Sequence, residues 1–93
     1  MSVLKEEQKK ILRGIWPVET NVVRMTAAIL KQYLREHHVP EDLTASWADS
    51  KAQEIYEKSF TPEGLFRRIE SETAWFLDSC TADKEDKDVH VYE

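Results

Sequence analysis

Two adjacent histidines, His37 and His38, are the side chains in this chain with the clearest potential for chemistry, because Glu41 follows them closely. Imidazole and carboxylate groups bind zinc, and structural zinc sites usually take four ligands at paired spacings. Adjacent helical residues point about 100° apart, so both histidines cannot easily ligate one ion while their segment stays helical. The pattern favours the C-terminal end of a helix, which Pro40 stops. A protonated histidine there interacts favourably with the helix dipole. A metal-dependent enzyme is the alternative.

Cys80 and His90 have the residue types of a thiol nucleophile and its general base. However, Cys80 continues an apolar helical stripe, and free cysteine is among the most buried residue types, which favours a structural thiol. The chain has only two glycines and no glycine-rich phosphate loop. We therefore predict that the protein is not an enzyme and that it uses no cofactor or metal.

The charge distribution bears on nucleic-acid binding. The 93 residues carry a formal net charge of −5, which repels a phosphate backbone at long range. A basic face on the first helix carries Lys5, Lys9, Lys10 and Arg13, but two glutamates dilute it and no nucleic-acid motif accompanies it. This pattern argues against a nucleic-acid partner.

The same composition bears on location. No apolar run approaches the ~18 residues of a membrane span, and the N-terminus lacks the apolar region of a secretory signal. A single cysteine cannot form an internal disulfide framework. We expect a cytoplasmic protein that does not enter a membrane.

Three prolines divide the chain into four segments of similar length, and each segment has helical periodicity. The sequence predicts an all-α fold, a small antiparallel four-helix bundle over residues 1–80. A short acidic C-terminal tail, residues 81–93, is expected to be flexible, with strand propensity at 89–92. In the third helix, Ser46 and Asp49 have the spacing of a capping box, so regular helix is expected to begin there. The predicted helices are Ser2–Ile15, Pro17 or Asn21 to His37, Pro40–Ser59 and Pro62–Cys80, the last capped by Thr61.

Trp75 is the residue that helix geometry separates most clearly from the core. Its helix carries a full apolar stripe without it, and Trp75 falls about 140° from the centre of that stripe. Its neighbours on the same row, Arg68 and Ser71, are polar, and Trp with Arg is typical of binding hot spots. Trp16 and Trp47, in contrast, are expected to be structural. The sequence leaves open whether Trp75 contacts a partner or is covered by the tail. The stripe consists of Leu65, Phe66, Ile69, Thr73, Phe76, Leu77 and Cys80.

These patterns favour a small protein-binding, regulatory module that covers a surface of a larger partner protein. The first alternative is a homodimer that shares the apolar second helix or the face around Trp75 across a two-fold axis. The others are an inhibitor encoded by a mobile element and the enzyme discussed above. The residues expected to bind the partner are Trp75, Arg68, Ser71, Glu72, Val89, Val91 and Tyr92.

Overall fold

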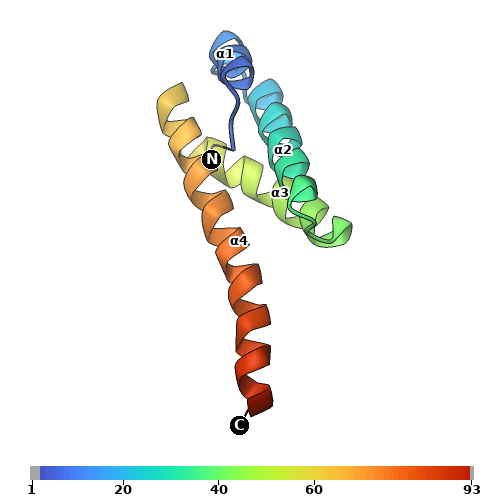
Figure 1. Ribbon diagram of the computed structural model, residues 1–93. Coiled ribbons are helices and arrows are strands. Elements are labelled where there is room, and N and C mark those ends of the chain that lie inside the picture. The colour runs from blue at the N-terminus through green and yellow to red at the C-terminus, as the bar shows by residue number, and fades with distance from the viewer. Residues whose placement is uncertain (1–2, 93) are drawn as a thin grey trace.

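The computed structural model describes residues 3–92 of the chain, and the side chains of residues 3–79. Within this range the chain forms four helices and no strand, which confirms the predicted all-α four-helix fold (Figure 1). The molecule is elongated, 52 × 22 × 22 Å, because α4 runs past the other three helices. The helices are α1 Glu6–Ile15, α2 Glu19–Glu36, α3 Glu41–Glu57 and α4 Pro62–Tyr92.

Polar contacts between the helices show that neighbours run antiparallel. Glu19 of α2 contacts Gln53 of α3 at 2.8 Å, and Lys31 of α2 contacts Asp49 of α3 at 2.9 Å. The residue number in α3 therefore falls as the residue number in α2 rises. The same order relates the N-terminal region to α4, where Arg13 lies beside Glu63 and Val3 beside Glu70. The short connection between α2 and α3 therefore joins two antiparallel helices.

The predicted start of the last helix is confirmed. The Gly64 backbone N–H donates to the Thr61 hydroxyl at 3.0 Å, so Thr61 caps α4, which begins at Pro62. Trp16 has an extended backbone before Pro17, and its ring packs on Tyr56 with centroids 5.7 Å apart. The Tyr56 hydroxyl donates to the Pro17 carbonyl at 2.9 Å, so α3 holds the corner between α1 and α2.

The prediction that regular helix begins at Ser46 is wrong, because α3 begins five residues earlier, at Glu41. Glu41 lies in the first turn, where a carboxylate interacts favourably with the helix dipole. The Thr44 backbone N–H donates to the Pro40 carbonyl at 2.9 Å, which closes the first turn directly after the proline. A capping box is therefore not needed at Ser46, which lies inside the helix.

The predicted extended segment at 89–92 is also wrong, because the backbone of α4 continues as helix through Tyr92. Starting a helix is costly, but extending one adds a hydrogen bond for each residue fixed. The buried half of α4 supplies that start, and residues 81–88 contain no glycine or proline to end the helix. The division into a domain at 1–80 and a flexible tail at 81–93 stays a prediction.

The core lies where the four helices meet, and it is made mainly of aliphatic side chains from every helix. Three threonines are also fully buried, and the hydroxyls of two of them, Thr26 on α2 and Thr73 on α4, have no hydrogen-bond partner. Burying a hydroxyl without a partner costs free energy. The largest fully buried side chains are Leu12, Val22, Leu30, Leu34, Ile55, Leu65 and Ile69, with the threonines.

We predict that Thr26→Val and Thr73→Val each raise the free energy of unfolding by about 1 kcal/mol. Valine has nearly the shape of threonine, so the substitution removes the unpartnered hydroxyl and leaves the packing in place. Urea denaturation of the two variants measures the effect. A loss of stability in both would mean that these hydroxyls are hydrogen-bonded in solution.

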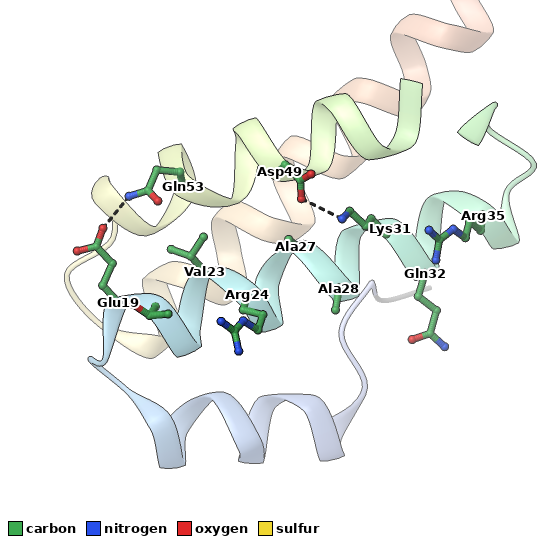
Figure 2. A pocket seen from close by; sticks show the side chains of 11 residues that line it. Glu19, Val23, Arg24, Ala27, Ala28, Lys31, Gln32, Arg35, Asp49 and Gln53 are labelled. Atoms are coloured by element: carbon green, nitrogen blue, oxygen red, sulfur yellow. Dashed lines mark hydrogen bonds and ion pairs between the residues drawn. The ribbon is translucent and has the colours of Figure 1, made fainter. Parts of the chain in front are cut away.

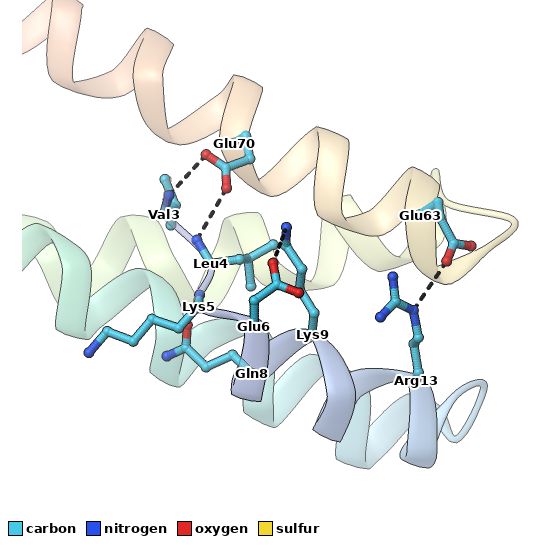
Figure 3. Close-up of polar contacts among 9 residues, drawn as sticks. All are labelled: Val3, Leu4, Lys5, Glu6, Gln8, Lys9, Arg13, Glu63 and Glu70. Atoms are coloured by element: carbon cyan, nitrogen blue, oxygen red, sulfur yellow. Dashed lines mark hydrogen bonds and ion pairs between the residues drawn. The ribbon is translucent and has the colours of Figure 1, made fainter. Parts of the chain in front are cut away.

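The N-terminal segment before α1 is attached to α4 by one carboxylate (Figure 3). The Glu70 side chain accepts hydrogen bonds from the backbone N–H groups of Val3, at 2.9 Å, and Leu4, at 3.1 Å. Both of these apolar side chains are buried against the core. The first helix was predicted to begin at Ser2, but it begins at Glu6. The residues before Glu6 are therefore outside the helix and can fold back onto α4.

Replacing Glu70 with alanine should lower the free energy of unfolding by about 1–3 kcal/mol, since hydrogen bonds to a charged acceptor are stronger than neutral ones. Glu70→Gln keeps one acceptor oxygen and should lose less. Chemical denaturation gives the values. Equal stability of Glu70→Ala and wild type would show that this attachment does not contribute to the fold.

Candidate functional site

Trp75 lies on the outer side of α4, as the sequence geometry predicts, and its side chain is 63% exposed. Because α4 continues as a straight extension beyond this point, residues 81–92 lead away from Trp75 rather than over it (Figure 1). A second large aromatic side chain, Phe60 in the loop before α4, is 90% exposed. Exposed apolar side chains mark a candidate binding site only where they belong to one continuous surface.

Three adjoining hollows connect these two aromatic residues along the seam between α3 and α4. The first, about 410 Å³, is lined by Trp47 and Phe76 among others and shares Lys51 with the second. The second, about 390 Å³, includes Trp75 and shares Ser71 with the third, about 510 Å³, which includes Phe60. We call this surface the α3–α4 face. Its principal residues are Leu43, Trp47, Lys51, Glu54, Phe60, Arg68, Ser71, Glu72, Trp75 and Phe76.

Two aromatic side chains pack together at one end of the face. The rings of Trp47 and Phe76 are stacked, with centroids 4.3 Å apart and an angle of 18° between their planes. Leu43, one turn before Trp47, is 51% exposed and extends the apolar surface. Trp47 thus has the structural role expected of it, but it also contributes to the surface, because it is only half-buried.

A chain of ion pairs occupies the middle of the face. Lys51 lies between Glu54, at 3.4 Å, and Glu72, at 3.5 Å, while Lys58 pairs with Glu54 at 3.2 Å. The hydrogen bonds from Lys58 and Lys51 hold the pKa of the Glu54 carboxyl below its usual value of 4.5. These four side chains neutralise one another. The face is therefore polar but nearly uncharged between its two aromatic ends.

The lowered pKa of Glu54 predicts a small pH dependence of stability. A group whose folded pKa is lowered stabilises the fold above its unfolded value, and that contribution is lost as the pH falls through the folded pKa. We expect wild type to be more stable than Glu54→Gln at neutral pH, and the difference to shrink below pH 4.5. Thermal unfolding of both proteins across this range tests it. A difference that does not change with pH would rule out the ionised pair as its source.

Arg67 and Arg68 leave the face with unpaired positive charge. Both side chains are exposed and line the hollow next to Phe60. Neither has a hydrogen bond or ion pair within residues 3–79. Guanidinium groups pair well with carboxylates, often through two hydrogen bonds. This end of the face is therefore suited to an acidic group.

Of the predicted site residues, the structure brings Trp75, Arg68, Ser71 and Glu72 together on one face. The side chains of Val89, Val91 and Tyr92, like those of Cys80 and His90, lie outside the described residues. Sequence reasoning missed Phe60 and the Trp47–Phe76 pair. Phe60 had a usable signal, because an aromatic residue directly before a helix cap lies outside any helical stripe.

The corner with His37 and His38 has the geometry of a helix end. His38 has a φ of 62°, in the left-handed region that commonly ends helices, and His37 packs on Tyr33. Glu41 contacts Arg35 through both carboxylate oxygens, at 2.8 and 2.7 Å, which lowers the pKa of that carboxyl. In the part of the chain that was searched, no three potential metal ligands lie together.

The basic face of α1 is largely engaged within the chain. Lys9 pairs with Glu6 at 3.3 Å, and Arg13 pairs with Glu63 at 3.2 Å, as Figure 3 shows. The Arg13 guanidinium also lies over the Phe66 ring, 5.1 Å from its centroid. Of the four cations, Arg13 therefore holds α1 against α4, while Lys9 pairs within α1.

Comparisons of this chain with models of protein families, with curated proteins and with solved structures find no match. Within residues 3–92, no helix combines the length and apolar character that crossing a membrane requires.

Proposed function

We propose that this chain is a small protein-binding module that regulates a larger partner by covering part of its surface with the α3–α4 face. The observation that carries the proposal is the exposed indole of Trp75, 63% accessible on a helix whose core face is complete without it. Tryptophan and arginine dominate binding energy at many interfaces. The α3–α4 face carries one residue of each type, Trp75 and Arg68, together with the exposed Phe60.

The chemistry of the face indicates what kind of surface it fits. Its two aromatic ends favour apolar hollows or ridges on the partner, and the neutral ion-pair chain between them can stay hydrogen-bonded when it is covered. The unpaired Arg67 and Arg68 favour carboxylates at one end. The proposed partner surface is therefore apolar opposite the two aromatic ends, polar and uncharged between them, and acidic near the position that Phe60 meets. The proposal includes the cytoplasmic location expected from the sequence.

Affinity capture from a lysate of the native cell tests this proposal. Wild type should retain a partner that Trp75→Ala and Phe60→Ala fail to retain. Ile11→Ala is the matched control, because Ile11 is also an exposed apolar side chain, 43% accessible, but lies on α1. Capture of the same proteins by all four baits, or loss with Ile11→Ala alone, would contradict the assignment of the face.

A further inference from the structure

The α3–α4 face carries an excess of positive charge at one end. The two lysines and two glutamates of its ion-pair chain cancel one another. Arg67 and Arg68 are left over, both exposed and without a hydrogen bond or ion pair within residues 3–79. With four cations against two acids, the face has a formal charge of +2, and this excess lies about two helical turns before Trp75.

The far end of α4 carries the opposite charge and is uncovered. Beyond Trp75 the helix continues to Tyr92 and stands apart from α1, α2 and α3 (Figure 1). Residues 81–93 contain five acids and two lysines, a net charge of −3. Because α4 is continuous and leads away from the body, this end cannot reach the arginines of its own chain. As helix, residues 81–92 span about 18 Å, which matches the stretch of about 20 Å from the start of α4 to Trp75.

The charges of α4 run in opposite order on the two sides of Trp75. Arg67 lies eight residues before Trp75, and Asp83 lies eight residues after it. If two copies of the helix lie antiparallel and cross at Trp75, residues at equal distances before and after Trp75 face each other. Arg67 of one copy then lies opposite residue 83 of the other, and Arg68 lies within one turn of residue 86. The sequence of α4 is therefore complementary to itself in this register.

The uncharged positions of α4 also fit this register. Trp75 meets its own counterpart, and Ser71 lies opposite Ser79, so small side chains beside the indoles allow the helices to approach closely. Residues 89–92, which include two valines and a tyrosine, reach the exposed Phe60 of the other copy. One like-charge pair arises, Glu72 opposite residue 78, but Glu72 is already paired with a lysine of α3.

We propose that two copies of this chain form an antiparallel α4–α4 dimer, in which residues 81–92 of each copy lie on the α3–α4 face of the other. Charge selects this occupant, because the excess cations of the face meet the acidic helix end. The contact is the same on both copies, so the assembly closes at two. A regulatory consequence follows that rests on the proposed function: the dimer covers Trp75, and it therefore competes with the larger partner for the α3–α4 face.

Sedimentation of the full-length protein tests the dimer by a charge exchange. Wild type should be a dimer at micromolar concentration. A chain with Arg67→Glu and Arg68→Glu should have a dimer dissociation constant at least about tenfold higher, because each changed contact occurs twice. A chain with Asp83→Lys and Asp86→Lys should be weakened similarly. An equimolar mixture of the two chains should restore a dimer, since both contacts of the mixed dimer then join opposite charges.

Two cations outside the α3–α4 face provide the matched control. Arg24 is exposed on α2, where it points away from α3 in Figure 2, and Lys10 is exposed on α1. Neither has a hydrogen bond or ion pair within residues 3–79. A chain with Lys10→Glu and Arg24→Glu has the same net charge as the variant with both arginines reversed, but its α4 is unchanged. Its dimer should dissociate as that of wild type does. Circular dichroism confirms that each variant is folded.

Four results would overturn the dimer. They are a wild type that stays monomeric at high micromolar concentration, a dimer that neither set of α4 charge reversals weakens, equal weakening by the control variant, and failure of the mixed chains to associate.

The dimer and the proposed function can fail separately. Sedimentation of the purified chain needs no partner, so a monomeric wild type would leave the result of affinity capture standing. An affinity capture that retains nothing would likewise leave the dimer standing. Adding the captured partner should convert the dimer into a complex with one copy of this chain. A complex that keeps two copies would contradict the competition.

Discussion

Trp75→Ala should raise the dissociation constant for the partner about 30-fold or more, because truncating a hot-spot residue costs 2 kcal/mol or more. The same change should leave the melting temperature close to that of wild type. The Trp75 indole is mostly exposed, so its removal takes little apolar surface from the folded chain. Titration calorimetry with the captured partner and thermal unfolding of the free protein give the two values.

Trp75→Phe provides the conservative control for this prediction. Phenylalanine keeps an aromatic surface but loses the larger ring and the indole N–H, so its affinity should fall between those of wild type and Trp75→Ala. Ile11→Ala should bind as wild type does. A melting temperature that falls by more than about 5 °C in Trp75→Ala would indicate a core role for the indole instead.

Ile69→Ala should lower the free energy of unfolding by about 2–5 kcal/mol, the cost of removing a large buried aliphatic side chain. Ile69 lies on the inner side of the same helix as Trp75 and is fully buried. A domain of this size has about 5–15 kcal/mol of stability in total. The substitution therefore removes a large part of it, and the urea midpoint should shift accordingly.

Ile69→Val is the matched control, because it removes one methylene group and should cost only about 0.5–1.5 kcal/mol. The two α4 positions then form a contrast within one helix, in which Ile69 determines stability and Trp75 determines binding. If Ile69→Ala unfolds at the same urea concentration as wild type, the core packing described for α4 is incorrect.

The start of α4 was predictable because it depends on local chemistry. Thr61 and Pro62 determine where α4 begins through one side-chain hydrogen bond and one fixed backbone angle. The outward direction of Trp75 was predictable for a similar reason, since 100° per residue places it away from the apolar stripe. Both inferences need only residues of one helix and its cap.

The rest of the site depends on contacts between distant segments. The Trp47–Phe76 stack joins α3 to α4, and the Lys51–Glu72 pair does the same, so no local pattern reveals either. The docking of Val3 onto Glu70 spans 67 residues. The path of α4 beyond Cys80 was missed for a different reason, because residues 81–88 lack an apolar face and helix continues there by extension alone.

Hydroxyl-radical footprinting of the protein with and without its captured partner tests the central claim most directly, because it reads side-chain exposure residue by residue. The account predicts that oxidation of Trp75 and Phe60 slows in the complex, while Tyr33 and His37 at the far end of α2 react as they do in the free protein. Unchanged oxidation of Trp75 and Phe60 in a complex that has formed would show that the α3–α4 face is not the binding surface.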